Sequence, residues 1–154
     1  MADPQRNRDL GTKHQFHGLQ PELPVAGALA TVNYYRDVLG FEIDFIDRRP
    51  PMHARVKKGD RTYGDPVFIH FGETGGTSVK GFGGQFRIHV GHDVDGLFAT
   101  YQKLGVDILA LPTTQPWGLR EFSIRDCNGY TLCFCGYVAD VSPRIGSDHT
   151  CAEG

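Results

Sequence analysis

The sequence contains an internal repeat, and this repeat restricts the chain to a fold built from two similar halves. When the sequence is shifted by 65 residues, two segments come into register without a gap: Leu39-Gly40-Phe41 lies over Leu104-Gly105-Val106. Upstream of them, Val25 lies over Val90. Because a unit of about 60 residues buries little of its surface on its own, we expect the two halves to pack against each other.

Each half shows the same order of predicted elements. Apolar residues recur with helical spacing before Gly40 and before Gly105, and glycine commonly ends a helix because it adopts the left-handed conformation at low cost. A short strand precedes each helix, and strand-like runs follow at residues 41–47, 53–58 and 67–71 and at residues 106–111, 121–125 and 130–135. The pattern predicts an α+β fold in which two paired βαβββ modules form a curved mixed sheet around a cleft.

The rest of the chain divides into two tails and a linker. We expect flexible tails at residues 1–15 and 138–154 around a single domain, residues 16–137, with modules at 16–72 and 84–137. Residues 73–83 form a glycine-rich linker in a chain that has 20 glycines among 154 residues, well above the average of about 7%. Such a linker would let one module pair with that of a second copy. We therefore expect a homodimer, either domain-swapped or unswapped.

Charge and cysteine usage exclude several classes of protein. The net charge is −2, with 16 basic and 18 acidic residues, and a nucleic-acid-binding protein normally carries a clustered basic surface. No apolar run reaches the roughly 18 residues of a membrane helix, and the N-terminus lacks the apolar region of a secretory signal. The four cysteines crowd near the C-terminus, unlike a disulfide framework. We expect a cytoplasmic protein with reduced thiols that binds neither nucleic acid nor membranes.

Strand alternation separates a face packed against the helices from a face toward the cleft. Leu19, Leu23 and Val25 of the first strand are expected to face the helix. The expected cleft face carries polar and aromatic residues, namely Gln20, Phe68 and His70 of the first half and Gln85, Arg87, His89, Glu121 and Cys133 of the second. These residues are candidate ligand-binding residues, and a solvated strand face is the alternative interpretation for each of them.

The last predicted hairpin carries the most specific motif. Residues 115–134 read QPWGLREFSIRDCNGYTLCF, which closely resembles the bleomycin-resistance pattern PWGxREFxxRDPxGxxxxF. Together with the two βαβββ modules, the chain from residue 18 to 137 resembles the vicinal oxygen chelate superfamily of glyoxalase I, extradiol dioxygenases and fosfomycin- and bleomycin-resistance proteins. The resemblance to drug-binding members implies that Trp117 stacks on a planar ligand. The alternative role for Trp117 is to cover the core beside Pro116.

The resemblance also implies four strand positions that hold a metal ion in the enzymes of the superfamily. These positions correspond to Gln20, His70, Gln85 and Cys133, and Cys133 stands where the enzymes have a glutamate. The set lacks a carboxylate for Mg²⁺ or Mn²⁺, and one thiolate with one histidine is a poor zinc site. If His89 joined as an extra ligand, a His/His/Cys zinc site would become available.

We therefore expect a protein that binds and sequesters an antibiotic-type small molecule without a metal, a cofactor or catalysis. No catalytic residue is assigned. One alternative is a metal-dependent glyoxalase, lyase, isomerase or dioxygenase-type enzyme with a divergent ligand set. A third interpretation is an accessory domain that binds a metabolite.

Overall fold

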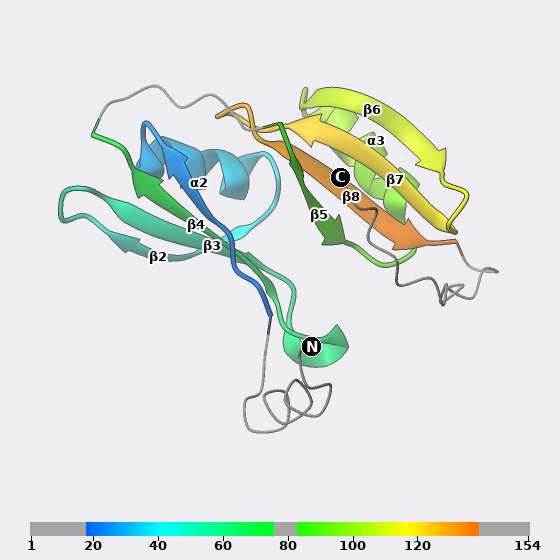
Figure 1. The fold of residues 1–154 in the computed structure, drawn as a ribbon, viewed down its shortest axis with the longest axis horizontal. Helices are drawn as coiled ribbons and strands as arrows, with labels where there is room; N and C mark the ends of the chain where they lie inside the picture. Colours follow the sequence, from blue (N-terminus) through cyan, green and yellow to red (C-terminus); the bar gives the residue numbers. More distant parts are fainter. Residues whose placement is uncertain (1–17, 76–82, 139–154) are drawn as a thin grey trace, which may run out of the picture.

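The structure is a computed structural model that describes residues 18–75 and 83–138. Most of the predicted tails and linker lies outside these residues. The described part consists of a first module, residues 18–75, and a second module, residues 83–138 (Figure 1).

Each module has the predicted βαβββ order. The first module contains β1 (Glu22–Val25), α2 (Ala28–Asp37), β2 (Glu42–Asp47), β3 (His53–Lys58), the short 3₁₀ helix η1 (Arg61–Tyr63) and β4 (Val67–Glu73). The second module contains β5 (Gln85–His89), α3 (Val94–Lys103), β6 (Asp107–Thr114), β7 (Leu119–Arg125) and β8 (Thr131–Tyr137). The predicted α+β class and the two repeated modules are thereby confirmed.

The strands form two separate four-stranded mixed sheets with the same topology. The strand orders are β1-β4-β3-β2 and β5-β8-β7-β6. β1 is parallel to β4 and β5 is parallel to β8, whereas the other neighbours are antiparallel. Among the described strands, the first strand of each module therefore occupies an edge of its sheet and has one hydrogen-bonded neighbour.

Local sequence signals explain where the two helices begin and end. Gly40 and Gly105 follow the helices with φ angles of 74° and 73°, the left-handed conformation predicted for them. At the start of α3, the Asp93 carboxylate accepts a hydrogen bond from the Gly96 backbone N–H at 3.0 Å. Neither helix in the described part of the chain has the length and apolar character needed to cross a membrane.

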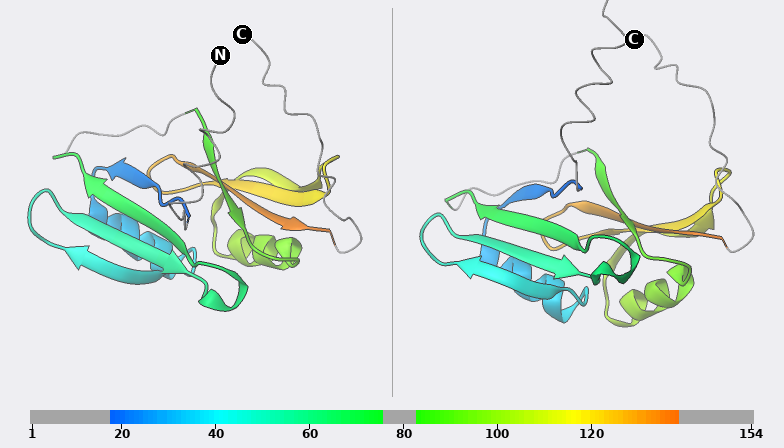
Figure 2. Two further views of the ribbon diagram at one scale, coloured as in Figure 1. Left: turned by 60° about the horizontal axis from the view of Figure 1, so that its bottom comes forward. Right: turned by 90° about the horizontal axis from the view of Figure 1, so that it is seen from below.

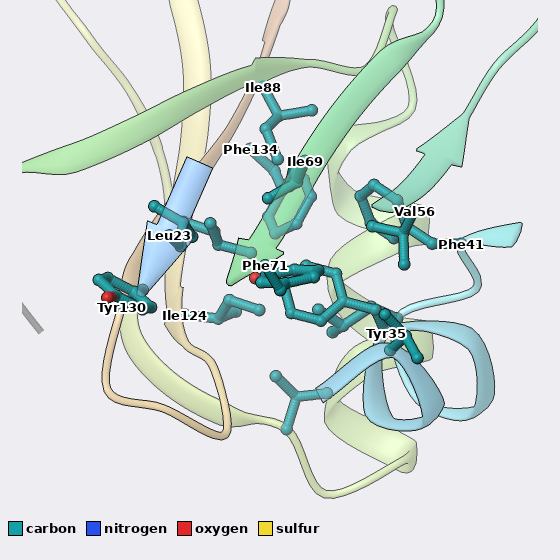
Figure 3. Close-up of a cluster of buried hydrophobic side chains, with 14 of the residues drawn as sticks. Leu23, Tyr35, Phe41, Val56, Ile69, Phe71, Ile88, Ile124, Tyr130 and Phe134 are labelled. Atoms are coloured by element: carbon teal, nitrogen blue, oxygen red, sulfur yellow. The ribbon is translucent and has the colours of Figure 1, made fainter. Parts of the chain in front are cut away.

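The two modules share one apolar core. Leu23 and Val25 are buried as predicted, but the prediction for Leu19 is wrong: this side chain is 93% exposed because it precedes β1. Figure 3 shows Tyr35 and Phe71 of the first module packed near Ile124 of the second. Because these side chains come from both modules, the core belongs to the chain as a whole.

Tyrosine hydroxyl groups connect the modules across this core. The Tyr35 hydroxyl donates to Oδ2 of Asp126 at 2.8 Å, and the Tyr101 hydroxyl donates to the Leu39 carbonyl at 2.8 Å. The Tyr130 hydroxyl donates to the carbonyl of Pro24 at 2.6 Å. These bonds fix the relative position of the two modules at the sides of the sheets that carry the helices.

Candidate functional site

We call the face of each sheet opposite its helix the outer face. Each sheet has its helix on one face only (Figure 2). Since both helix-bearing faces contribute to the shared core, the two outer faces point away from it. Apart from His89 and Trp117, the predicted ligand-binding residues are thus divided between the two modules rather than gathered in one cleft within the chain.

The outer face of the first module carries a chain of polar contacts centred on His70 of β4. Nε2 of His70 lies 2.8 Å from Oε1 of Gln20, and Nδ1 of His70 lies 3.0 Å from Nε2 of His53 on β3. Nδ1 of His53 in turn lies 3.7 Å from Oε1 of Glu22 on β1. The structure therefore brings the predicted residues Gln20 and His70 together and adds His53 and Glu22 to them.

An aromatic and cationic group lies beside these histidines. The guanidinium carbon of Arg55 is 5.0 Å from the centre of the Phe45 ring and 4.8 Å from that of Phe68. Arg55 also donates to Oδ2 of Asp44, with its Nη2 at 2.5 Å and its Nε at 2.8 Å. The Phe45 ring is 5.6 Å from the His53 ring. Phe68, a predicted ligand-binding residue, is thus engaged by a neighbouring cation.

The surroundings of His70 favour its neutral form. Partial burial lowers the pKa of His70, and the nearby charge of Arg55 and the second imidazole, His53, act in the same direction. A neutral imidazole keeps a lone pair on one ring nitrogen, which is the form that accepts hydrogen bonds and binds metals.

The outer face of the second module carries a different polar group. Arg87 of β5 and Glu121 of β7 form an ion pair. Cys133 of β8 faces them at the register position of Arg87 but is 1% exposed. Burial raises the pKa of the Cys133 thiol. Gln85 lies at the start of β5 and is exposed.

The four positions that the resemblance assigns to a metal ion do not fit one. Gln20, which precedes β1, and His70 lie in the first module, and Gln85 and Cys133 lie in the second. Burial raises the pKa of the Cys133 thiol, which disfavours the thiolate that a metal ion binds. Among the described residues, no three or more His, Cys, Asp or Glu side chains are grouped to hold a metal ion. A set of two neutral amides, one imidazole and one thiol also offers no negative charge to a dication.

A hollow lies between the modules. It is a pocket of about 840 Å³ bordered by the β3–β4 connection, the β5–α3 connection and the end of β8. Phe41, Val67, Leu97, Tyr101 and Phe134 contribute apolar and aromatic walls. The size and composition are typical of a site for a drug-sized molecule.

Polar groups lie at the rim of this pocket. Nδ1 of His92 donates to the carbonyl oxygen of Tyr137 at 3.0 Å, and the His89 ring lies 6.2 Å from the Tyr137 ring. Lys58 and Asp65 border the opposite side. His89 is therefore the predicted ligand-binding residue that lines the pocket.

Trp117 lies elsewhere. It is in the turn between β6 and β7, is 56% exposed and does not line the pocket. Gly118 beside it has a φ of 86°, which explains the Trp-Gly pair in this turn.

Several site residues were not found from the sequence. His53 and Arg55 alternate with the buried residues Ala54 and Val56, so their outward direction was readable from the strand period. Their proximity to His70 was not, because it depends on the pairing of β3 with β4. The pocket also escaped prediction, since its walls come from the packing of two modules.

Comparison with known proteins identifies one superfamily. The sequence model of the Glyoxalase/Bleomycin resistance protein/Dioxygenase superfamily matches residues 19–134. No curated protein matches the chain.

Solved structures show the same fold. A bleomycin-binding protein from bleomycin-producing Streptomyces verticillus, complexed with copper(II)-bleomycin, is 26% identical, with a TM-score of 0.60 over 82% of this chain and 99% of that chain. TioX from Micromonospora sp. ML1 is 25% identical, with a TM-score of 0.57 over 78% of this chain and 98% of that chain. A glyoxalase/bleomycin resistance protein/dioxygenase from Nocardioides is 15% identical, with a TM-score of 0.64 over 90% of this chain and 95% of that chain, and shows similarity of fold alone.

Proposed function

The chain belongs to the glyoxalase/bleomycin resistance protein/dioxygenase superfamily, and we propose that it binds and sequesters an amphipathic, antibiotic-type small molecule without chemical conversion. The pocket of about 840 Å³ between the modules carries this proposal. Its aromatic walls suit a planar apolar body, and the histidines at its rim suit polar substituents. The relative from Streptomyces verticillus, which binds copper(II)-bleomycin, supports a ligand of this class.

Isothermal titration of the full chain against bleomycin, copper(II)-bleomycin and other aromatic antibiotics tests the proposal. We expect saturable one-site binding, and mass spectrometry should recover the ligand unchanged. Absence of binding to all of these compounds, or conversion of a bound compound, would contradict it.

Two matched variants of α3 locate the ligand. Leu97 lines the pocket, so Leu97→Trp should occupy part of its volume and weaken binding at least about 10-fold, equivalent to about 1.4 kcal/mol. Ala99 is exposed on the same helix, and Ala99→Trp should leave the affinity unchanged. Circular dichroism should show both variants folded.

We further propose a homodimer, which would give the separated outer faces a role. A second copy could place the outer face with Gln20, Phe68 and His70 against the partner's outer face with Gln85, Arg87, Glu121 and Cys133. The edge strands β1 and β5, each with one hydrogen-bonded neighbour, are available for such pairing. Light scattering coupled to size exclusion should give twice the chain mass of 17.0 kDa.

The variant Trp117→Ala tests whether the ligand binds in the pocket within the chain or at another site. A ligand in the pocket should bind this variant normally, because Trp117 does not line that pocket. Loss of binding in Trp117→Ala, with normal binding in Leu97→Trp, would exclude the pocket as the ligand site. We also propose that the protein acts in the cytoplasm, which cell fractionation tests.

A further inference from the structure

Two imidazole rings meet edge to edge on the outer face of the first module. We propose that His53 and His70 together bind a divalent transition-metal ion with a preference for tetragonal coordination, Cu²⁺ or Ni²⁺, through Nε2 of His53 and Nδ1 of His70. This inference does not rest on the proposed small-molecule function. It also differs from the four-position set rejected above, because it uses His53 and needs neither Gln85 nor Cys133.

The distance between the two ring nitrogens suits a pair of neighbouring ligands. Nε2 of His53 and Nδ1 of His70 are 3.0 Å apart. With metal–nitrogen bonds of about 2.0–2.1 Å, two nitrogens at this distance subtend an angle of roughly 95° at the metal. This is close to the right angle between adjacent ligands of square-planar or tetragonal Cu²⁺ and Ni²⁺. The rings lie at 81° to each other, so the two imidazoles are not stacked.

One of the two remaining ring nitrogens already has the oxygen partner that a metal-binding histidine requires, and the other faces a carboxylate beyond hydrogen-bond distance. Nε2 of His70 lies 2.8 Å from Oε1 of Gln20, which accepts its hydrogen. That assignment leaves the lone pair of His70 on Nδ1, facing His53. Nδ1 of His53 faces the Glu22 carboxylate at 3.7 Å. When Nε2 of His53 gives up its hydrogen to bind the metal ion, the neutral ring carries its hydrogen on Nδ1, toward that carboxylate.

The nearby charges permit a cation at this position. Arg55 is the adjacent positive side chain, and its guanidinium is paired with Asp44 at 2.5 Å. Asp47 lies opposite His53 in the register of β2 and β3, where Arg49 pairs with it. Glu22 therefore supplies a negative charge beside the two rings that neither Arg55 nor Arg49 neutralises.

The surroundings leave room for further ligands. The side chain of His53 is 34% exposed and that of Glu22 is 62% exposed, so water reaches the pair. Among the described residues no third His, Cys, Asp or Glu joins the group as a ligand. Water or donor atoms of a bound small molecule would complete the coordination.

Titration of the full chain with Cu²⁺ tests the proposal. His14, His17 and His149 lie outside the described residues, so the parent for this experiment carries all three as glutamine. We expect one Cu²⁺ per chain, with electron paramagnetic resonance showing coupling to two nitrogens. Ni²⁺ should compete for the site, whereas Mg²⁺ and Ca²⁺ should not, because these ions prefer oxygen ligands.

Substitutions assign the ligands. His53→Ala and His70→Ala should each weaken Cu²⁺ binding more than about 10-fold, and Gln20→Ala about 10-fold through loss of the hydrogen-bond partner. The double variant His89→Ala/His92→Ala removes two histidines of the second module and should bind like the parent. Unchanged affinity in His53→Ala would overturn the proposal. An electron paramagnetic resonance spectrum of the Cu²⁺-loaded parent that shows coupling to fewer than two nitrogens would also overturn it. That result does not depend on the folding of any variant.

Discussion

At the scale of single residues, Asp126 shows how one buried carboxylate organises the junction of the two modules. It is 5% exposed, and its Oδ1 accepts hydrogen bonds from the backbone N–H groups of Asn128 and Tyr130 while its Oδ2 accepts from Tyr35. Burial raises the pKa of Asp126 above its ordinary value of 3.8, although these hydrogen bonds act in the opposite direction. The cost of removing the charge from water therefore exceeds what the hydrogen bonds return.

This raised pKa predicts a particular pH dependence of stability. Because the folded state holds the Asp126 proton more tightly than the unfolded state, its contribution is complete below pH 3.8 and is lost as the pH rises through the folded-state pKa. Asp126→Asn keeps the shape but does not ionise. The free energy of unfolding in urea, wild type minus Asp126→Asn, should fall between pH 3.5 and 7.5.

A carboxylate with the opposite shift provides the control. The hydrogen bond from Arg120 lowers the pKa of Asp95, so its contribution is present above pH 3.8 and is lost as the pH falls. The free energy of unfolding of the wild type minus that of Asp95→Asn should therefore rise with pH. If the difference in the free energy of unfolding between wild type and Asp126→Asn stays constant from pH 3.5 to 7.5, burial does not raise the pKa of Asp126 as argued.

At the residue scale, the strand period indicates which face a strand side chain lies on, but not which side chains it contacts. The strand period placed Gln20 and His70 on one face, and their side chains do meet at 2.8 Å. It could not show that His53 also meets His70, because that contact depends on how two strands far apart in sequence are aligned. The same limit applies to Asp126, whose partner Tyr35 lies in the other module.

At the scale of elements, Glu73 corrects the predicted end of the first module. The expected linker began at residue 73, but Glu73 is the last residue of β4. Its carboxylate accepts hydrogen bonds from the backbone N–H of Ala28 at 3.0 Å and of Met52 at 3.3 Å. One side chain thus holds the start of α2 and the β2–β3 connection against β4. The glycine-rich composition predicted a linker but not where pairing of β4 stops.

Glu73→Ala should therefore destabilise the first module. It leaves two backbone donors without their carboxylate partner, and we expect a loss of about 1–3 kcal/mol in the free energy of unfolding. Urea denaturation followed by circular dichroism measures it. Glu42→Ala on β2 is the control: Glu42 forms a mostly exposed ion pair with Lys57 at 3.5 Å, and its loss should cost less than about 1 kcal/mol. Equal losses in the two variants would show that the Glu73 bonds contribute little.

At the scale of the whole molecule, the repeat predicted two modules but left their arrangement open. The same strand pattern is compatible with two arrangements. The modules of one chain can meet through their cleft-facing sides and enclose a cleft, or through their helix-bearing sides and form a core. Tyr35, Phe71 and Ile124 form part of one core cluster in the structure, so the helix-bearing sides meet within the chain. The arrangement follows from complementary packing across the module boundary, which no local pattern encodes.

A shared core predicts that the modules unfold together. Trp117 is the single tryptophan and lies in the second module, so its fluorescence reports on that module, whereas Phe71 is fully buried in the first. Phe71→Leu should remove packing against Tyr35, whose ring centre is 4.9 Å away, and cost about 1–3 kcal/mol. Because Tyr35 also bonds to Asp126 of the second module, the urea midpoint seen by Trp117 should fall as much as that seen by circular dichroism. A midpoint of Trp117 that stays in place while the circular dichroism midpoint falls would mean that each module is stable by itself, and that the shared core couples them weakly.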